Sequence, residues 1–228
     1  MQKNSRWHVL ETAEHVAQAV YQRILDAAEQ AIASRGHFKL VLAGGGTPEK
    51  VYQLLAQSEA DWRNWYIYYG DERCLPVADK DRNSVMAGQA FLNKVPIPAA
   101  QIFTIPAELG PAQGAEQYQT AVADALPFDM VLLGMGEDGH TASLFPGHQH
   151  APDQFTHAVY NSPKPPPERV SISAGALSNT HELIFLITGS NKQEAVSAWK
   201  QGDNLPVATV VPDNGIDVFI DQDADRAG

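Results

Sequence analysis

Hydrophobic residues recur along the chain with two different spacings, which predict alternating helices and strands. Over residues 12–34 apolar side chains return every three or four positions, as on one face of a helix, and Gly36 follows as a stop signal. Residues 38–43 (FKLVLA) form a short, mostly apolar run that is followed by three glycines, as a buried strand would be. Thr47 and Pro48 then predict the start of another helix, with Thr47 as its capping residue.

The same alternation continues to the end of the chain. We predict further helices over residues 112–126 and 191–200, and further strands over residues 65–69, 128–133, 182–188, 207–211 and 217–220. Mostly apolar strands without polar alternation, separated by helices, indicate a largely parallel sheet covered on both faces. No repeat or break in composition divides residues 1–228, so we expect one α/β domain, with a stiff loop at 163–167 and a frayed polar tail at 221–228.

The composition limits the size of the core and the compartment that we expect for the protein. A chain of 228 residues with 44% hydrophobic residues can bury one sizeable core. Its one cysteine, Cys74, cannot form an internal disulfide, which fits a reducing compartment. The first residues lack the apolar run of a signal peptide, and no apolar run is long enough to cross a bilayer. We therefore expect a soluble, cytoplasmic protein.

The net charge of -11 argues against nucleic acid or an anionic membrane as a partner. It also constrains any phosphorylated ligand. A few of the 16 lysines and arginines would have to gather in one pocket against the overall field of the protein.

Polar, glycine-rich segments follow four of the predicted strands. They are AGGGTP, GDER, GMGEDGH and TGSNK. In an open α/β sheet, ligands bind beyond the carboxyl ends of the strands, so these segments are candidates for one site.

The first segment, Gly44-Gly45-Gly46-Thr47, is either a tight turn or an anion site formed by the backbone N–H groups that begin a helix. It lacks the lysine of a P-loop, and Glu49 replaces the third glycine of a dinucleotide-binding loop. A literal G-x-G-x-x-G occurs at residues 134–139, but its two carboxylates would repel a pyrophosphate. We therefore predict no nucleotide site there.

The third segment places a carboxylate, Asp138, two residues before His140. A carboxylate beside a histidine can orient a general base, and an imidazole with an ordinary pKa of about 6.5 accepts a proton near neutral pH. Thr141 and Ser143 follow as alternative nucleophiles, but they lack the strand-to-helix elbow that such a serine occupies in hydrolases.

Other polar residues have less specific surroundings. Asp71, Glu72 and Arg73 form either a solvated turn or an orienting acid with a substrate-binding cation. Taken singly, Arg169 and Lys192 are surface charges. Cys74 is expected to pack under a loop, and the pair His148 and His150 lacks further metal ligands, so we expect a surface position for it.

Taken together, these segments resemble the 6-phosphogluconolactonase family, which is related to the glucosamine-6-phosphate deaminases. The matching pieces occur in the family's order and run from Gly44 to Val196: GGGTPEKVY, GDERCLP with the downstream DRNS, FDMVLLGMGEDGHTASLFPG, PPPERVSIS and ITGSNKQEAV. The third piece is very specific, whereas the first and last are shared with the deaminases. The family commonly has serine at the position of Gly46, so one hydroxyl contact to phosphate is missing here.

The resemblance implies one domain with a Rossmann-like, doubly wound sheet and helices on both faces, without a nicotinamide cofactor or a metal. It also implies hydrolysis of a phosphorylated sugar lactone, 6-phosphogluconolactone, in the oxidative pentose phosphate pathway. The roles that it implies for this chain start with His140 as the base for water, and include catalytic contributions from Asp71 and Arg73. Substrate and phosphate would be bound by Gly44, Gly45, Gly46, Thr47, Asp138, Arg169 and Lys192.

Two other functions stay open at this point. The deaminases carry an Asn-Glu-Pro run after Asp-Gly-His, and this chain has Leu144, Phe145 and Pro146 at the corresponding positions, so the deaminase acid is absent. A non-catalytic phosphosugar sensor would keep the phosphate loop and Lys192 without needing His140. The oligomeric state is not indicated by the sequence.

Overall fold

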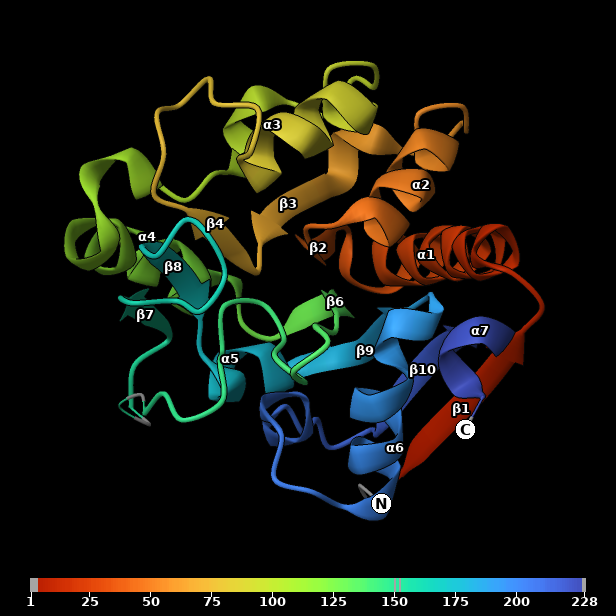
Figure 1. Ribbon diagram of the computed structural model, residues 1–228. Coiled ribbons are helices and arrows are strands. Elements are labelled where there is room, and N and C mark those ends of the chain that lie inside the picture. Colours follow the sequence, from red (N-terminus) through yellow and green to blue (C-terminus); the bar gives the residue numbers. More distant parts are fainter. Residues whose placement is uncertain (1–3, 150, 152, 227–228) are drawn as a thin grey trace.

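A seven-stranded parallel sheet forms the centre of the computed structural model, which describes residues 4–149, 151 and 153–226 (Figure 1). Its strand order is β1-β10-β9-β6-β2-β3-β5, and every neighbouring pair is parallel. The strands are β1 (Ser5–Leu10), β2 (Phe38–Leu42), β3 (Trp65–Tyr69), β5 (Ile102–Phe103), β6 (Phe128–Gly134), β9 (Thr180–Ile187) and β10 (Ile216–Asp221).

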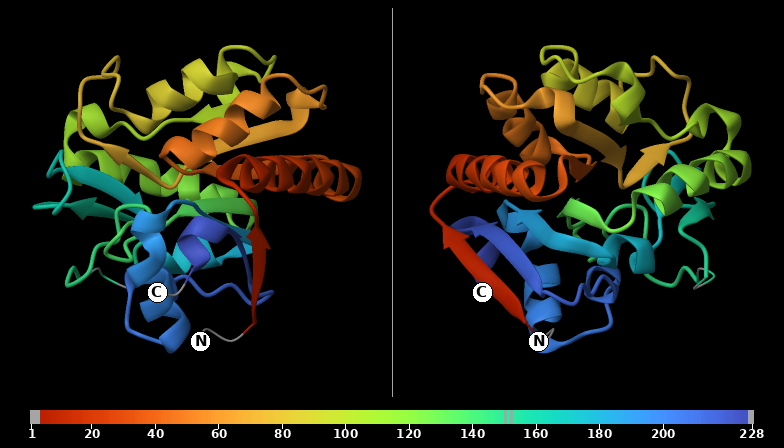
Figure 2. Two further views of the ribbon diagram at one scale, coloured as in Figure 1. Left: turned by 45° about the vertical axis from the view of Figure 1, so that its right-hand side comes forward. Right: turned by 180° about the vertical axis from the view of Figure 1, so that it is seen from behind.

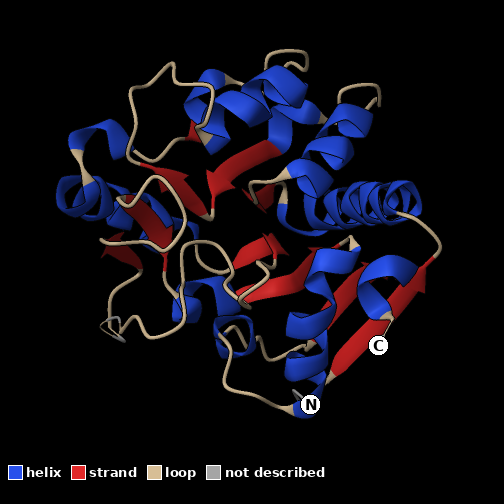
Figure 3. Cartoon of the chain, in the orientation of Figure 1, coloured by secondary structure: helices blue, strands red, loops and turns tan. Residues whose placement is uncertain are grey.

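Helices flank this sheet (Figure 3). They are α1 (Ala13–Arg35), α2 (Gly46–Leu55), α3 (Asn83–Ala87), α4 (Pro111–Ala125), α5 (Ala174–Ser178), α6 (Gln193–Gln201) and α7 (Gln222–Asp225). The long helix α1 packs against β2, β6 and β10, whereas α6 and α7 lie over the β9–β10 side in Figure 1. The predicted α/β sheet flanked by helices is therefore confirmed.

A second, antiparallel sheet lies beside the first and was not predicted. It has the strand order β4-β8-β7, with β4 at Asp71–Arg73, β7 at Thr156–Val159 and β8 at Arg169–Ile172. Its register pairs Arg73 with Arg169 across neighbouring strands. Two cations that are far apart in the sequence are thus brought to one place.

The order of the central sheet creates a switch point between β2 and β6. These strands are neighbours, and the chain proceeds from β2 to β3 and β5 on one side and from β6 to β9 and β10 on the other. Loops that leave the carboxyl ends of such a pair diverge and leave a crevice, where ligands of this fold class bind. The glycine loops after β2 and β6 border this crevice.

Most predicted elements agree with the structure to within two residues at each end, but the strand predicted at 207–211 is wrong. That segment begins with a 3₁₀ helix, Pro206–Thr209. Proline at its start favours a helical turn, and buried Val207 and Val210 are three residues apart, which is the repeat of a 3₁₀ helix.

Two other expectations are also corrected. Helix α2 starts at Gly46 with Gly45 as its cap residue, so Thr47 lies inside the first turn, and its hydroxyl contacts the Thr188 hydroxyl at 2.6 Å. Residues 222–225 of the tail, which we expected to be frayed, form helix α7, and the Asp221 side chain caps it by accepting from the Ala224 N–H. The sequence pattern also missed β1, an edge strand that pairs with β10 and lies beside it in both views of Figure 2.

Candidate active site

A pocket of about 220 Å³ opens at the switch point, and seven of the predicted site residues line it. These are Gly44, Gly45, Asp71, Arg73, His140, Arg169 and Lys192. They come from the ends of β2, β3, β6 and β9 and from the small antiparallel sheet. The fold therefore collects in one cavity residues that are distributed over most of the sequence.

The glycine loop after β2 begins helix α2 and leaves its first N–H groups without a side-chain cap. Gly45 has φ of 109°, a conformation that side-chain-bearing residues rarely adopt. A Cβ at Gly44 would lie 2.1 Å from the Asn83 Oδ1 atom, so only glycine fits there. Free N–H groups at a helix N-terminus favour an anion. Gly46 and Thr47 follow without lining the pocket.

The loop after β6 holds His140 against Asp138. The His140 Nδ1 atom lies 2.5 Å from the Asp138 Oδ1 atom, which also accepts from the His140 backbone N–H at 3.2 Å. Burial alone would raise the pKa of Asp138, but the hydrogen bond and charge of His140 outweigh it and lower that pKa. The Asp138 carboxylate is thus ionised at neutral pH and contacts the histidine instead of lining the pocket.

One glycine of the literal G-x-G-x-x-G, Gly136, makes room for this histidine. A Cβ at Gly136 would lie 2.0 Å from the His140 Nδ1 atom, so the imidazole occupies the space that a side chain would need. Gly139 has φ of 77°, and its carbonyl accepts from the Val207 N–H at 3.0 Å. The prediction that this pattern is not a nucleotide-binding loop therefore has a physical explanation in the packing of His140.

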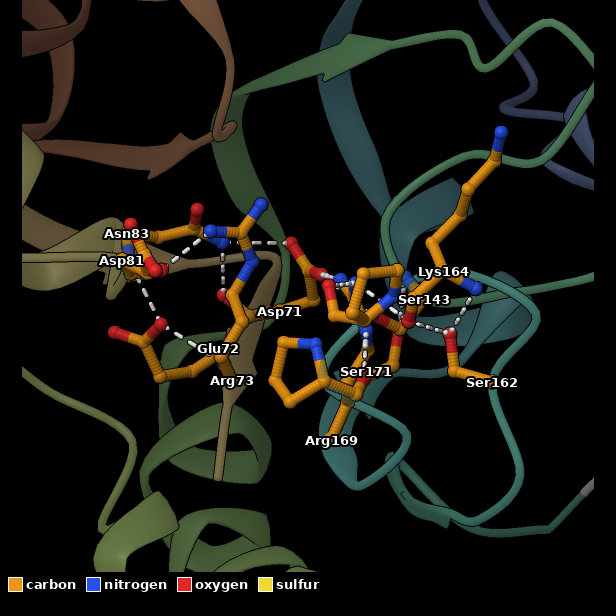
Figure 4. A network of polar contacts seen from close by, with 12 residues as sticks. Asp71, Glu72, Arg73, Asp81, Asn83, Ser143, Ser162, Lys164, Arg169 and Ser171 are labelled. Carbon is orange, nitrogen blue, oxygen red and sulfur yellow. Dashed lines mark hydrogen bonds and ion pairs between the residues drawn. The ribbon is translucent and has the colours of Figure 1, made fainter. Parts of the chain in front are cut away.

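Asp71 is the centre of a buried polar network (Figure 4). Its Oδ1 atom accepts from the Asn83 Nδ2 atom at 3.1 Å, and its Oδ2 atom accepts from the Ser143 hydroxyl at 2.5 Å. The Ser171 hydroxyl lies 3.2 Å from the Ser143 backbone nitrogen, which donates to it. Both carboxylate oxygens are therefore fixed in position, and no hydrogen bond or ion pair joins Asp71 to His140 among the described residues.

Glu72 is fully buried, contrary to the reading of a solvated turn. Its carboxylate accepts from the backbone N–H groups of Arg73, Asn83 and Ser84 at 2.7–2.9 Å. It also lies 3.4 Å from the Arg82 guanidinium. Glu72 thus holds the start of α3 and the backbone of Asn83 in place. Asn83 lines the pocket but was not predicted as a site residue, although it belongs to the DRNS segment.

The three cations of the pocket differ in how many hydrogen bonds and ion pairs they already make with other groups of the protein. Arg73 donates to the Asp81 carbonyl, while its buried Nε has no hydrogen-bond partner among the described residues. Arg169 is buried, lies 3.8 Å from the Asp71 carboxylate and donates to carbonyls of residues 164–166. Lys192 is half-buried, and burial lowers its pKa. Its ammonium makes no hydrogen bond or ion pair within the described ranges, so it can bind an anion.

The candidate nucleophiles are both engaged in hydrogen bonds. The Thr141 hydroxyl donates to the Gly134 carbonyl at 2.8 Å, and the buried Ser143 hydroxyl donates to Asp71. The structure thus gives no support to a covalent mechanism at either residue.

The remaining candidates lie away from this chemistry. Burial raises the pKa of Cys74 to about 11, so its thiol stays protonated at neutral pH. His148 lies in a separate hollow, and His150 falls outside the described residues. Over residues 4–149, 151 and 153–226, no three His, Cys, Asp or Glu side chains are grouped to hold a metal ion. The same part of the chain contains no helix long and apolar enough to cross a membrane.

Fold and pocket together define a class, that of α/β enzymes with a small anion-binding pocket and a histidine–aspartate pair at the switch point. A model of the family described as glucosamine-6-phosphate isomerases/6-phosphogluconolactonase matches residues 11–219. The chain belongs to this family.

Individual relatives give a finer position within the family. The 6-phosphogluconolactonase of Mycobacterium bovis is 35% identical over 226 residues, which cover 90% of this chain and 91% of that protein. A 6-phosphogluconolactonase structure from Thermotoga maritima has a TM-score of 0.89 at 26% identity and covers 96% of this chain and 100% of that one. A structure of the Trypanosoma brucei enzyme has a TM-score of 0.88 at 25% identity, with 98% of both chains covered. The chain is therefore an enzyme of the 6-phosphogluconolactonase branch, as the motifs predicted.

Proposed function

We propose that this enzyme hydrolyses 6-phosphogluconolactone to 6-phosphogluconate, with His140 as the general base. The observation that carries the proposal is the His140–Asp138 pair, whose histidine lines a pocket together with Lys192 and two residues of the glycine loop, Gly44 and Gly45. The names of the relatives supply the substrate, and the geometry supports the roles.

The pairing of His140 with Asp138 determines which nitrogen can act. An ionised carboxylate accepts a hydrogen bond, so Asp138 favours the tautomer with the proton on Nδ1. The Nε2 atom then carries the free lone pair. Packing of the imidazole against the Phe145 ring, at 4.6 Å between ring centroids, further restricts its orientation.

In the proposed reaction, a water oxygen attacks the lactone carbonyl carbon while its proton passes to Nε2 of His140. The carbonyl oxygen becomes an oxyanion, which positive charge from the pocket arginines can stabilise. The bond to the ring oxygen then breaks, and the imidazolium returns the proton to that oxygen. Because the lactone is already a reactive ester, positioning and charge stabilisation suffice without a covalent intermediate.

Asp71 and Asp138 have different roles in this proposal. Asp138 positions the base, whereas Asp71 is held by Asn83 and Ser143 on both oxygens and so acts as a fixed acceptor. A fixed carboxylate can accept from a sugar hydroxyl and can balance the charge of Arg169 at 3.8 Å. At the other end of the substrate, the N–H groups of the glycine loop and Lys192 bind the phosphate.

The direct test is hydrolysis of fresh 6-phosphogluconolactone, corrected for spontaneous opening, compared with release of ammonia from glucosamine 6-phosphate. We expect lactone turnover well above the blank and no ammonia, because Phe145 occupies the position of the deaminase acid. Ammonia release without lactone turnover would replace the proposal by the deaminase function. Binding of 6-phosphogluconate without turnover of either compound would replace it by the sensor function.

Two accompanying expectations remain predictions. We propose that residues 1–228 form one domain, supported by the pairing of β1 with β10 at opposite ends of the chain. We also keep the prediction of a cytoplasmic location, and several relatives carry names that include the word chloroplastic.

A further inference from the structure

The side-chain amide of Asn83 is fixed in one orientation. Asn83 begins α3 and is buried, with 4% of its surface exposed. Its Nδ2 atom donates to the Asp71 backbone carbonyl at 2.9 Å and to the Asp71 Oδ1 atom at 3.1 Å, and Figure 4 shows the two residues side by side. A backbone carbonyl can only accept a hydrogen bond, so the NH2 group must face Asp71. The amide oxygen, Oδ1, therefore points away from Asp71.

This amide oxygen faces the glycine loop after β2. A Cβ at Gly44 would lie 2.1 Å from the Asn83 Oδ1 atom, and both residues line the pocket. The oxygen accepts no hydrogen bond from the described residues, since the bonds of Asn83 run through its backbone N–H and its Nδ2 atom. It is also not one of the fully buried side-chain atoms that lack a partner, so part of its surface is open. The Asn83 Oδ1 atom is thus a free acceptor in the wall of the pocket.

The backbone of Asn83 is held as firmly as its side chain. The N–H groups of Asn83 and Ser84 donate to the buried Glu72 carboxylate at 2.7 Å and 2.9 Å. Since both ends of the residue are anchored, the Oδ1 atom cannot turn toward another donor of the protein. A polar atom of a buried side chain is normally satisfied, so this oxygen calls for a donor from a molecule in the pocket.

The chemistry of the pocket selects the kind of group that can donate to this oxygen. The cations that line the pocket, Arg73, Arg169 and Lys192, can only donate, as can the free N–H groups of the glycine loop. They suit the phosphate and carbonyl oxygens of a sugar lactone, which present lone pairs. The donors of such a lactone are its ring hydroxyls. An amide oxygen accepts from a hydroxyl without adding a negative charge near the phosphate.

We propose that Asn83 is a specificity-determining residue of this pocket, and that its Oδ1 atom accepts a hydrogen bond from one ring hydroxyl of the phosphorylated lactone. The inference rests on the proposed function for the identity of the ligand. Asn83 supplies a selectivity that Lys192 and the glycine loop do not, because groups that bind the phosphate do not contact the ring hydroxyls.

The test uses 1,5-anhydroglucitol 6-phosphate, a ring of the same size as the lactone that has no carbonyl group and cannot be hydrolysed. It is compared with the derivatives that lack the hydroxyl at C2, at C3 or at C4, and calorimetry gives the Kd of each compound. For the parent protein we expect the loss of at least one hydroxyl to raise the Kd about tenfold, because it leaves the acceptor in the pocket wall unpaired.

Asn83→Ala identifies the hydroxyl that Asn83 binds. The variant should bind the complete ring about tenfold more weakly than the parent, and removal of that hydroxyl should cost it nothing further. A hydroxyl bound by Asp71 would behave differently, because the Ser143 hydroxyl still holds the Asp71 carboxylate, and its removal should weaken binding equally in parent and variant. Asn93→Ala is the matched control: Asn93 is exposed and does not line the pocket, so every Kd should stay parental.

Several results would overturn the role of Asn83. They are a parent that does not bind the complete ring or binds all four compounds equally, and an Asn83→Ala protein with the parental Kd. An Asn83→Ala protein that binds more weakly but still discriminates every hydroxyl as the parent does would reduce Asn83 to a structural support of Asp71. Since binding is measured without turnover, an inactive protein with discrimination that depends on Asn83 would contradict the proposed function and leave this inference intact. Lactone turnover without such discrimination would do the reverse.

Discussion

Replacing Gly136 by alanine puts a methyl group where the His140 imidazole lies. The new Cβ would be 2.0 Å from Nδ1 and 2.1 Å from Cε1 of His140, and 2.7 Å from the Asp138 Oδ1 atom. Contacts of this kind are ordinary only from 3.4 Å, so the ring must retreat by more than 1 Å, about the difference between these distances. The backbone of Gly136 is not in the left-handed region, so alanine is compatible with the chain itself.

The ring can retreat only by losing its 2.5 Å contact with Asp138. Misplacement of a catalytic group by about 1 Å can cost on the order of 10²-fold in rate, and complete loss of a general base costs about 10²–10⁴-fold. We therefore expect Gly136→Ala to lower kcat by roughly 10²–10³-fold, or about 3–4 kcal/mol in barrier height. The KM should change little, because the phosphate-binding groups are not displaced.

The assay follows 6-phosphogluconate formation from fresh lactone, with the spontaneous rate subtracted at each pH. Gly175→Ala is the matched control: it makes the same chemical change within α5, where the nearest atom to the new Cβ is 4.0 Å away, and it should keep parental kcat. A Gly136→Ala protein that is folded and has parental kcat would show that the position of His140 does not limit the reaction.

Three further predictions concern groups around the site. Glu72→Ala should destabilise the fold by about 3–5 kcal/mol in urea unfolding, because it removes one of the two carboxylates that face the buried Arg82 and leaves the Arg73, Asn83 and Ser84 N–H groups without their acceptor; a loss below about 1 kcal/mol, typical of an exposed pair, would contradict this account. The pKa of Asp138 is lower in the folded protein than in the unfolded chain, so its ionised carboxylate stabilises the fold at pH values above its unfolded-state pKa. This stabilisation is lost as the pH falls through the lowered, folded-state pKa, so the Tm difference between the parent and Asp138→Asn should shrink in acid. A Tm difference that stays constant with pH would contradict this prediction. Ser143→Ala removes one of the two bonds that hold the Asp71 carboxylate and should lower kcat/KM by about fivefold to tenfold, and retention of parental kcat/KM would show that this bond is dispensable.

Local pattern was sufficient for the five inner strands of the central sheet and for the position of the pocket, but not for the edge strands β1 and β5. The strands β2, β3 and β6 are short, mostly apolar runs with a glycine at or just after their carboxyl ends, and this pattern can be recognised without any knowledge of tertiary contacts. The same reasoning located the pocket, because the carboxyl ends of parallel strands meet at one edge of a sheet.

The antiparallel sheet could not be derived in this way. Its strand β4 has three residues, all charged, and becomes a strand only because β8 pairs with it. Burial of Glu72 likewise depends on Arg82 and on N–H groups that arrive from a different segment. Charged residues after a strand are normally exposed to solvent. The burial of Glu72 could not be predicted because its partners lie in another segment of the chain.

The sequence predicted which types of residue would be in the site, but not how each side chain is bonded there. The spacing of Asp138 and His140 indicated a pair, and the structure shows their contact at 2.5 Å. Arg169, in contrast, donates to the carbonyls of its own loop, and this follows from tertiary geometry, which leaves nothing in the sequence to distinguish Arg169 from Lys192.

The most direct test of the central proposal is kcat of His140→Asn on 6-phosphogluconolactone across pH, with the blank subtracted. We expect kcat to fall by about 10²–10⁴-fold, or roughly 3–5 kcal/mol, because that is the usual effect of losing a general base. The Kd for 6-phosphogluconate should remain close to that of the parent, and the acid limb of the parental pH profile should disappear. A folded His140→Asn protein with near-parental kcat and an unchanged acid limb would contradict the assignment of His140 as the base.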